Sequence, residues 1–380
     1  MESARKLKIG LVFDDTLDSS DGVAQYVKTL GSWLSSQGHE VRYLVGETKL
    51  TEWSGGRVYS LAKNYKVTFN GNKLSIPGLA SRRRIKQVLD IEKFDVLHVQ
   101  APYSPLLAAR IVNLAPKTTA IVGTFHIFPA GWLSRVGSWL LRLALLRSLR
   151  RFSQVVSVSP AAASFAQAAF GLKTTVVPNA VDVAKFRMPA TTQKNIVFLG
   201  RLVDRKGCLS LLKAFNLVQA KMPGQRLTIA GVGPQRRSLE NYVRDNDLSA
   251  RVEFLGFVEE PRKAELLAGA KLACFPSLYG ESFGIVLIEA MAAGARVVLG
   301  GNNPGYASVL GEQPQLLIDP RQTAEFAQRL ELLLSDDTLA SQLHEWQNKS
   351  VGRYDVNRVG QEITDVYQAA IDIKGLSRHN

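Results

Sequence analysis

The chain has few of the residues that build disulfide or metal frameworks. Of its 380 residues only two are cysteines and five are histidines, and none shows the spacing of a zinc site. Cys208 and Cys274 are flanked by apolar residues, so we expect buried free thiols in a reducing compartment. The sequence therefore predicts neither a disulfide-stabilised domain nor a structural metal centre.

Long hydrophobic runs are also absent. The best candidate, residues 136–146 (VGSWLLRLALL), is shorter than the ~20 residues that span a membrane, and it contains Arg142. Residues 1–8 are polar and basic and lead directly into a strand-like run, so we expect no signal peptide. The sequence predicts a protein that does not cross a membrane.

Acidic residues are scarce in the first half of the chain. Residues 1–190 contain 25 Lys and Arg against 12 Asp and Glu, whereas residues 191–380 contain 22 against 21. Nearly all of the net charge of +14 therefore lies in the first half. This asymmetry predicts an anionic partner there, which is a membrane surface, an acidic acceptor or a nucleic acid. Because no RNP pattern, zinc spacing or helix-turn-helix stands out, we expect no nucleic-acid partner.

Strand-like and helical patterns alternate through both halves. The apolar runs of strand length are 8–13, 41–46, 95–100, 120–125, 155–158, 195–200, 226–231, 252–257, 272–276 and 296–300. Such runs between helices are typical of parallel sheets that helices cover on both faces. The sequence predicts an α/β fold with two doubly wound, Rossmann-like domains that face a central cleft. The stretch 179–193 lacks periodicity and predicts a linker.

Cations follow the first strand of the second half. In GRLVDRKG (200–207), Arg201 and Lys206 flank a short loop that leads into a helix. A bidentate guanidinium and a compact ammonium suit a diphosphate, although a solvated turn explains the pattern equally well.

Two glutamates stand eight positions apart after the strand at 272–276. In GESFGIVLIEA (280–290) we expect the helix to start at Ser282 or Phe283, which leaves backbone amides near Gly284 and Ile285 for a phosphate. Glu281 precedes the helix, and Glu289 would lie ~12 Å further on. A retaining glycosidase needs its carboxyl groups ~5 Å apart, so the pair instead predicts contacts with two ends of one long ligand.

These motifs together resemble a known family. ESFGIVLIE (281–289) matches an E-x7-E signature, and GRLVDRKG, VPNAVDVAKF (177–186) and the terminal helix fit the same group. The whole chain resembles the retaining glycosyltransferases of the GT-B fold, glycosyltransferase family 4. FNG (69–71), FDVLHVQAPYSPLL (94–107) and GTFH (123–126) more narrowly resemble the bacterial phosphatidylinositol mannosyltransferases.

The resemblance implies a division of labour along the chain. Residues 1–180 would form the acceptor-binding domain and residues 181–355 the nucleotide-sugar-binding domain, and residues 356–380 would form a helix that packs back on the first. The reaction would transfer a hexose with retention, without a metal or other cofactor. The implied donor is GDP-mannose and the implied acceptor is phosphatidylinositol. The main alternative is transfer from UDP-glucose or UDP-galactose to diacylglycerol, another lipid or a polyprenyl-linked acceptor. The alternative of another class is a non-catalytic membrane-associated protein or a nucleic-acid-binding protein.

The resemblance also implies residue roles. Arg201 and Lys206 would neutralise the donor diphosphate, and Glu281 would contact the transferred sugar. His126 would contact the reacting sugar and the acceptor hydroxyl, and Gly22 would contact the donor phosphate. The backbone of Phe283, Gly284 and Ile285 would contact sugar or phosphate. Glu289 would contact the ribose, and Glu260 and Lys263 would contact guanine. This chain departs from the family at Asp21, where a glycine is usual.

Two basic segments and Asn70 of the FNG motif are the candidates for acceptor or membrane contact. SRRRIKQ (81–87) places Arg82, Arg83, Arg84 and Lys86 at an expected helix start, where the helix dipole disfavours cations and an external anion would offset them. Residues 133–151 carry five arginines and no acid. They predict either an interfacial helix whose arginines reach lipid phosphates or a core helix with a solvated edge. We therefore expect a cytoplasmic protein bound peripherally to the inner face of the cell membrane.

Overall fold

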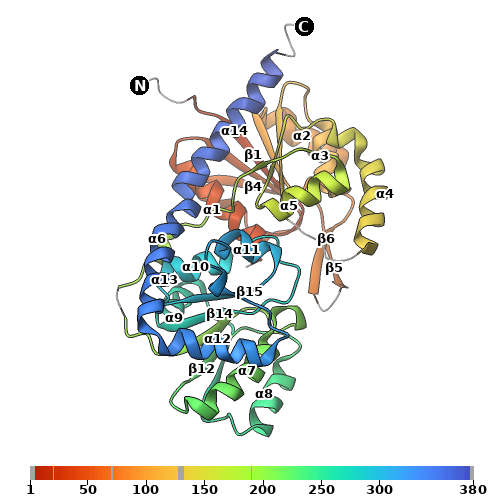
Figure 1. Cartoon of the computed structure of the whole chain (residues 1–380). Coiled ribbons are helices and arrows are strands. Elements are labelled where there is room, and N and C mark those ends of the chain that lie inside the picture. The colour runs from red at the N-terminus through yellow and green to blue at the C-terminus, as the bar shows by residue number, and fades with distance from the viewer. Residues whose placement is uncertain (1–4, 20, 70–71, 127–131, 190, 377–380) are drawn as a thin grey trace. The chain divides into compact units, whose positions relative to one another are not determined.

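The chain divides into two compact units with separate sheets (Figure 1). The computed structural model describes residues 5–19, 21–69, 72–126, 132–189 and 191–376. Unit 1 consists of Met1–Ala180 and Val356–Asn380, and unit 2 consists of Val181–Asp355.

An eight-stranded sheet forms the centre of unit 1, in the order β10-β9-β8-β7-β1-β2-β4-β3. Neighbouring strands are parallel apart from β3 and β4. The strands are β1 (Lys8–Phe13), β2 (Glu40–Val45), β3 (Glu52–Trp53), β4 (Gly56–Ser60), β7 (Val96–Gln100), β8 (Ala120–Phe125), β9 (Gln154–Ser157) and β10 (Thr175–Val176). A separate antiparallel hairpin pairs β5 (Asn64–Phe69) with β6 (Asn72–Pro77).

Helices cover both faces of this sheet because alternate strand residues point to opposite sides. The helices are α1 (Gly22–Ser36), α2 (Arg82–Glu92), α3 (Leu107–Leu114), α4 (Trp132–Leu149), α5 (Pro160–Phe165), the π-helix η1 (Ala166–Phe170) and α14 (Val356–Leu376). In β1, Ile9 and Leu11 join one apolar core with α1 and α14, whereas Val12 joins another with α2 and α3.

The last helix, α14, packs on unit 1 although it follows unit 2 in the sequence (Figure 1). The indole Nε1 of Trp33 donates to Asn357 Oδ1 over 3.0 Å. Gly360 lies so close to the Trp33 ring that a Cβ atom there would come within 2.4 Å of it. A side chain at position 360 would therefore push α14 away from α1.

Unit 2 contains a fully parallel six-stranded sheet in the order β13-β12-β11-β14-β15-β16. Its strands are β11 (Asn195–Leu199), β12 (Leu227–Ala230), β13 (Val252–Gly256), β14 (Ala270–Phe275), β15 (Val298–Gly301) and β16 (Leu317–Ile318). Its helices are α6 (Val183–Phe186), η2 (Asp204–Lys206), α7 (Cys208–Lys221), α8 (Arg236–Asp245), α9 (Glu260–Ala268), α10 (Ile285–Ala293), α11 (Pro304–Leu310), η3 (Pro314–Leu316), α12 (Thr323–Ser335), α13 (Asp337–Ser350) and η4 (Val351–Tyr354).

The α/β class and the two Rossmann-like sheets confirm the prediction, and each of the ten predicted strands is present within two residues. Two local predictions are wrong. The stretch 179–193 is not all linker, since α6 forms within it, and α10 begins at Ile285 instead of Ser282 or Phe283. Cys208 and Cys274 are buried free thiols as expected. No helix among the described residues is long and apolar enough to cross a membrane.

Candidate active site

The loops that follow β11 and β14 pack directly against each other. These strands are parallel neighbours, so their carboxyl ends meet at one edge of the sheet, where ligands of such folds bind. Gly207 has φ +69°, and a Cβ atom there would lie 2.0 Å from the carbonyl oxygen of Pro276. The amide of Leu278 donates to the carbonyl oxygen of Arg205 over 2.8 Å. Only glycine at position 207 allows this approach.

Glu281 meets two cations across these loops. Its Oε1 atom lies 2.8 Å from Lys206 Nζ and 2.9 Å from Arg205 Nη1. The three side chains are only 15% to 18% exposed. The structure thus brings together the predicted Lys206 and Glu281, and it adds Arg205, which the motif analysis missed. Arg201 belongs to the same electrostatic group, since its charge acts on Lys206.

The charges of this group shift one another's titration. Burial raises the pKa of Glu281, but Lys206 and Arg205 lower it more, so its pKa lies below the usual value. Burial together with Arg205 and Arg201 lowers the pKa of Lys206, and Glu281 offsets only part of this effect. The carboxylate is therefore ionised at neutral pH, and the cations around it repel one another.

A second layer fixes the backbone around Glu281. Ser277 forms a side-chain hydrogen bond with the Glu281 carboxylate, and its Oγ lies 3.2 Å from the buried hydroxyl of Tyr306. Gly305 at the start of α11 lies against the backbone of residues 281–283, where a Cβ atom would come within 2.3 Å of the Glu281 carbonyl oxygen. The carboxylate is thus held from behind by packed, hydrogen-bonded groups.

The helix that follows this loop begins without a side-chain cap. Gly284 is the N-cap residue of α10 and, as a glycine, supplies no side chain to cap the first amides. Phe283 is buried with its ring edge-on to Tyr354 at a centroid distance of 5.8 Å, so its side chain anchors the loop. Ile285 is the first helical residue. A helix start with a glycine N-cap, three residues after a carboxylate that two cations contact, can bind an anion.

The predicted nucleoside contacts form a second charged cluster. Lys263 Nζ lies 2.9 Å from Glu289 Oε1 and 3.0 Å from Glu260 Oε1, and it stands over the Phe186 ring at 5.0 Å. Burial lowers the pKa of Lys263, but the two carboxylates raise it above the usual value. The structure therefore joins Glu260, Lys263 and Glu289 in unit 2.

His126 follows β8 and is 5% exposed in unit 1. Its Nε2 atom lies 2.7 Å from Gln100 Oε1 at the end of the neighbouring strand β7, and its ring is edge-on to Tyr26. Burial lowers the pKa of His126 to about 3, and Asn179 offsets the shift only in part. The imidazole is neutral at physiological pH, so it can orient a ligand but does not carry a charge. Gln100 was missed by the motif analysis.

Gly22 is the first residue of α1, and Asp21 precedes it as the N-cap residue. The Asp21 Oδ1 atom accepts from the amides of Val23 at 2.9 Å and Ala24 at 3.1 Å. The departure from the family thus has a structural consequence, because Asp21 already bonds to amides at this helix start.

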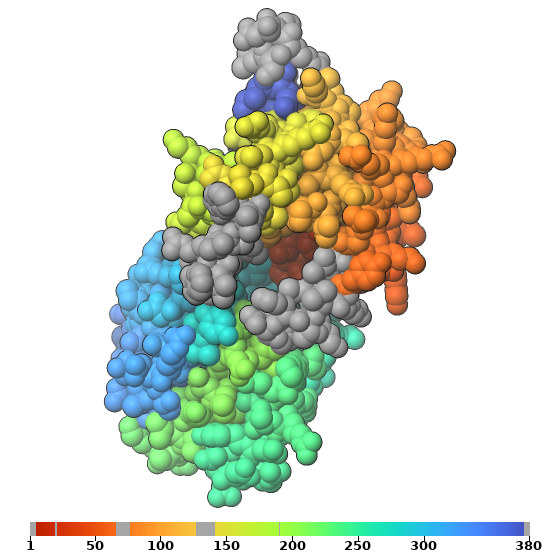
Figure 2. Space-filling model, turned by 90° about the vertical axis from the view of Figure 1, so that its right-hand side faces the viewer, coloured from red at the N-terminus to blue at the C-terminus, as the bar shows by residue number. Residues whose placement is uncertain are grey.

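The acceptor candidates differ in what the structure describes. Arg82, Arg83, Arg84 and Lys86 are exposed at the start of α2, and this orange part of the chain is open to solvent in Figure 2. Asn70 lies outside the described residues. Within residues 133–151, side chains are described from 141 onward, and there Leu143, Leu146 and Arg147 are exposed whereas Leu145 and Leu149 are buried.

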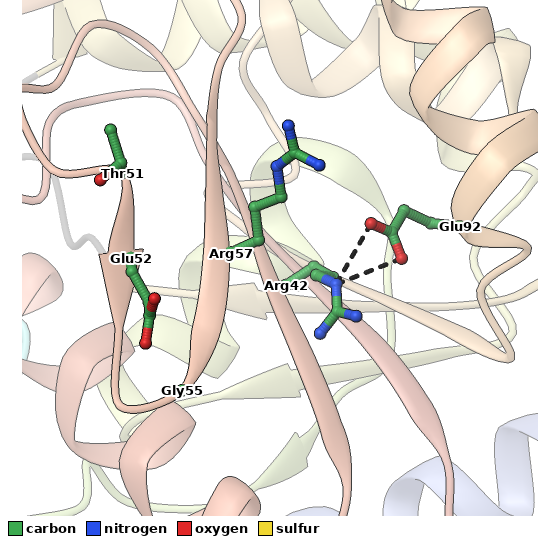
Figure 3. Close-up of a pocket in the computed structure, with 6 residues that line it drawn as sticks. All are labelled: Arg42, Thr51, Glu52, Gly55, Arg57 and Glu92. Carbon is green, nitrogen blue, oxygen red and sulfur yellow. Dashed lines mark hydrogen bonds and ion pairs between the residues drawn. The ribbon is translucent and has the colours of Figure 1, made fainter.

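A pocket of about 430 Å³ lies elsewhere in unit 1 (Figure 3). It is lined by Arg42, Thr51, Glu52, Gly55, Arg57 and Glu92. Glu92 is held there by Arg42 at 3.1 Å and Lys8 at 2.8 Å. Lys8 is the first residue of β1, so these pairs lie at the amino ends of the strands, opposite to the edge where ligands of parallel sheets bind. We assign the pocket to a structural ion-pair network.

Comparison with known proteins identifies the family. Residues 184–350 match the family described as "Glycosyl transferases group 1", and residues 20–185 match "Glycosyltransferase Family 4". The chain is 32% identical to the phosphatidyl-myo-inositol mannosyltransferase of Mycolicibacterium smegmatis, over 95% of this chain and 94% of that protein. Identity to the Mycobacterium tuberculosis protein of the same name is also 32%, over 95% and 97%. The chain therefore belongs to the same glycosyltransferase family as these mannosyltransferases.

The fold agrees with this assignment. Anabaena HepE, solved in complex with UDP and glucose, superposes with a TM-score of 0.73 at 18% identity, over 95% of this chain and 99% of that one. The GT-B fold is therefore confirmed, and membership of the family identifies the chain as a glycosyltransferase enzyme.

Proposed function

We propose that this glycosyltransferase transfers mannose from GDP-mannose to phosphatidylinositol with retention of configuration. Its similarity to phosphatidyl-myo-inositol mannosyltransferases over 95% of the chain supports mannose as the transferred sugar and phosphatidylinositol as the acceptor. The observation that carries the proposal is the group of Arg205, Lys206 and Glu281 just before α10, a helix whose N-cap residue is a glycine.

The donor diphosphate binds at the loops after β11 and β14. Arg201 and Lys206 neutralise the two phosphates, and the amides at the start of α10 add dipolar stabilisation. Charge builds up on the diphosphate as the sugar leaves, so these fixed groups stabilise the transition state more than the ground state. Glu281 contacts hydroxyls of the sugar, and the backbone of Phe283, Gly284 and Ile285 lines the same end. Glu260, Lys263 and Glu289 serve the nucleoside.

The acceptor hydroxyl attacks from the face that the diphosphate leaves. The departing diphosphate takes the proton, because the neutral His126 is a poor base at physiological pH. His126 orients the sugar and the acceptor hydroxyl, and Gln100 fixes the ring. The proposed reaction needs no metal, and the addition of a chelator should leave its rate unchanged.

The acceptor lipid is reached from an anionic membrane surface. Arg82, Arg83, Arg84 and Lys86 point to solvent, and Leu79, 78% exposed, precedes them. Cations around an exposed apolar side chain suit an anionic lipid surface. We therefore propose peripheral attachment to the inner face of the cell membrane, with exposed Leu143 and Leu146 of α4 as further apolar contacts.

A UDP-hexose donor is the second candidate. HepE, which has a similar fold, has been solved in complex with UDP-glucose and with UDP and glucose. In that case diacylglycerol or another lipid, including a polyprenyl-linked one, would accept glucose or galactose.

The test combines two donors with two acceptors. Purified protein is incubated with GDP-mannose or UDP-glucose and anionic liposomes that contain phosphatidylinositol or diacylglycerol, and the extracted lipids are weighed by mass spectrometry. We expect one added hexose on phosphatidylinositol, only with GDP-mannose, and none with Glu281→Gln. A hexose on diacylglycerol from UDP-glucose would replace both donor and acceptor, and no lipid product from either would contradict the proposal.

A further inference from the structure

Arg205 lies in the donor site without a role in the reaction described above. Its Nη1 atom and Lys206 Nζ contact the same oxygen of Glu281, at 2.9 Å and 2.8 Å. With Arg201 the group contains three cations and one carboxylate. The surplus is two positive charges, which matches a diphosphate ester with one negative charge on each phosphate.

The two cations that hold Glu281 differ in their freedom to leave it. The carbonyl oxygen of Arg205 accepts from the amide of Leu278, which belongs to the loop that carries Glu281. The Arg205 Cδ and Nη1 atoms lie 4.0 Å from the Cβ position of Gly280, so the side chain follows that loop to the carboxylate. Gly280 has φ +75° and gives the side chain this path.

Lys206 lies between two influences. The positive charge of Arg201 lowers the pKa of Lys206, and the negative charge of Glu281 raises it. An ammonium group on a flexible stem turns easily to a new anion. A diphosphate bound at these loops offers Lys206 a second anion, so it competes with Glu281 for the ammonium group that lies 2.8 Å from the carboxylate.

We propose that Arg205 is a positioning residue that keeps Glu281 paired and in place when the donor diphosphate takes Lys206 away. In the empty site Glu281 forms an ion pair with Lys206, and this pair must break before Lys206 can bind the diphosphate. In the loaded site Arg205 alone balances a carboxylate that is 15% exposed, and it aims that carboxylate at the sugar. This inference rests on the proposed function of the site.

A double-mutant cycle tests the inference with GDP and UDP as probes. Binding is measured by calorimetry for the wild type, Arg205→Gln, Glu281→Gln and the double variant. We expect Arg205→Gln to weaken nucleotide binding about tenfold, because bound diphosphate then leaves Glu281 unpaired, and Glu281→Gln to strengthen it several-fold. In the Glu281→Gln background, Arg205→Gln should change affinity by no more than about twofold.

Equal losses from Arg205→Gln in both backgrounds would overturn the inference, since Arg205 would then contact the phosphates itself. A wild type that binds neither GDP nor UDP would instead contradict the proposed function. Arg205→Lys should recover nucleotide affinity but only part of kcat, because a point charge does not aim the carboxylate, and full recovery of kcat would also count against a positioning role. The exposed Lys221–Glu331 pair, 2.8 Å apart in unit 2, gives the matched control cycle, and thermal unfolding checks that each variant is folded.

Discussion

At the scale of single residues, Asp14 is a buried carboxyl group at the end of β1. It is 8% exposed and accepts a short hydrogen bond from Ser104 and another from the amide of Ala108. Burial raises the pKa of Asp14 to about 7, and the nearby Asp15 adds to the effect. Between these two pKa values, 3.8 and about 7, the Asp14 carboxyl group is protonated in the folded chain and ionised in the unfolded chain.

The pH dependence of an Asp14→Asn variant follows from this shift. A folded-state pKa raised above the unfolded value of 3.8 contributes stability at low pH that is lost as pH rises through about 7. The neutral amide of the variant side chain does not titrate, so the variant does not lose this stability. The difference in the free energy of unfolding, variant minus wild type, should therefore be ~2–3 kcal/mol larger at pH 8 than at pH 5. Urea unfolding at the two pH values measures the change.

Asp18 provides the matched control in the same loop. Although burial raises the pKa of Asp18, its contacts with Lys49 and Thr48 lower it below the usual value. It is ionised in both states above pH 5, so Asp18→Asn should differ from the wild type by the same amount at pH 5 and pH 8. A constant difference for Asp14→Asn would contradict the assigned shift.

Motif spacing found the residues that carry charge but missed those that hold them. Lys206 and Glu281 were predicted from the sequence and do meet. Arg205 was overlooked because its neighbours fit the family motif, although its position beside Lys206 was visible. Gln100 could not be found, because its contact with His126 depends on the register that pairs β7 with β8.

At the scale of elements, the contact between the loops after β11 and β14 depends on Gly207. Its positive φ disfavours other residues, and a Cβ atom would collide with the Pro276 carbonyl oxygen. Any side chain there must separate the loop that carries Lys206 from the loop that carries Glu281.

Gly207→Ala should therefore lower both stability and nucleotide affinity. We expect a loss of at least ~1–2 kcal/mol in the free energy of unfolding from backbone strain alone. Urea unfolding and calorimetry with GDP check the two effects. Gly224 has open space around its Cβ position, so Gly224→Ala should change stability by less than ~0.5 kcal/mol. Equal effects at the two glycines would refute the loop contact.

Strands were easier to predict than helix starts. Long buried runs predicted the central strands of both sheets, whereas β10 and β16 have two residues each and leave no periodic signal. The start of α10 was placed too early because Gly284 extends the loop and Phe283 packs on Tyr354, a partner about seventy positions away. Tertiary contacts decide such boundaries.

At the scale of the whole molecule, the basic surplus of the first half makes the proposed attachment to an anionic membrane testable. Replacing Arg82, Arg83 and Arg84 with Gln should weaken binding to anionic vesicles by ~3 kcal/mol, or about a hundredfold, and should reduce its dependence on salt. Vesicle sedimentation at two salt concentrations measures both. The control replaces three exposed cations of unit 2, Arg244, Arg321 and Lys349. Equal losses would show a general effect of net charge and contradict a local membrane surface.

The central claim is that this chain transfers a hexose to a lipid with retention. The most direct measurement is the anomeric configuration of the sugar on lipid extracted after incubation with α-linked GDP-mannose and phosphatidylinositol liposomes, determined by NMR. The account predicts an α-linked mannose on phosphatidylinositol from the wild type. A β-linked product, or free mannose with unmodified lipid, would contradict it.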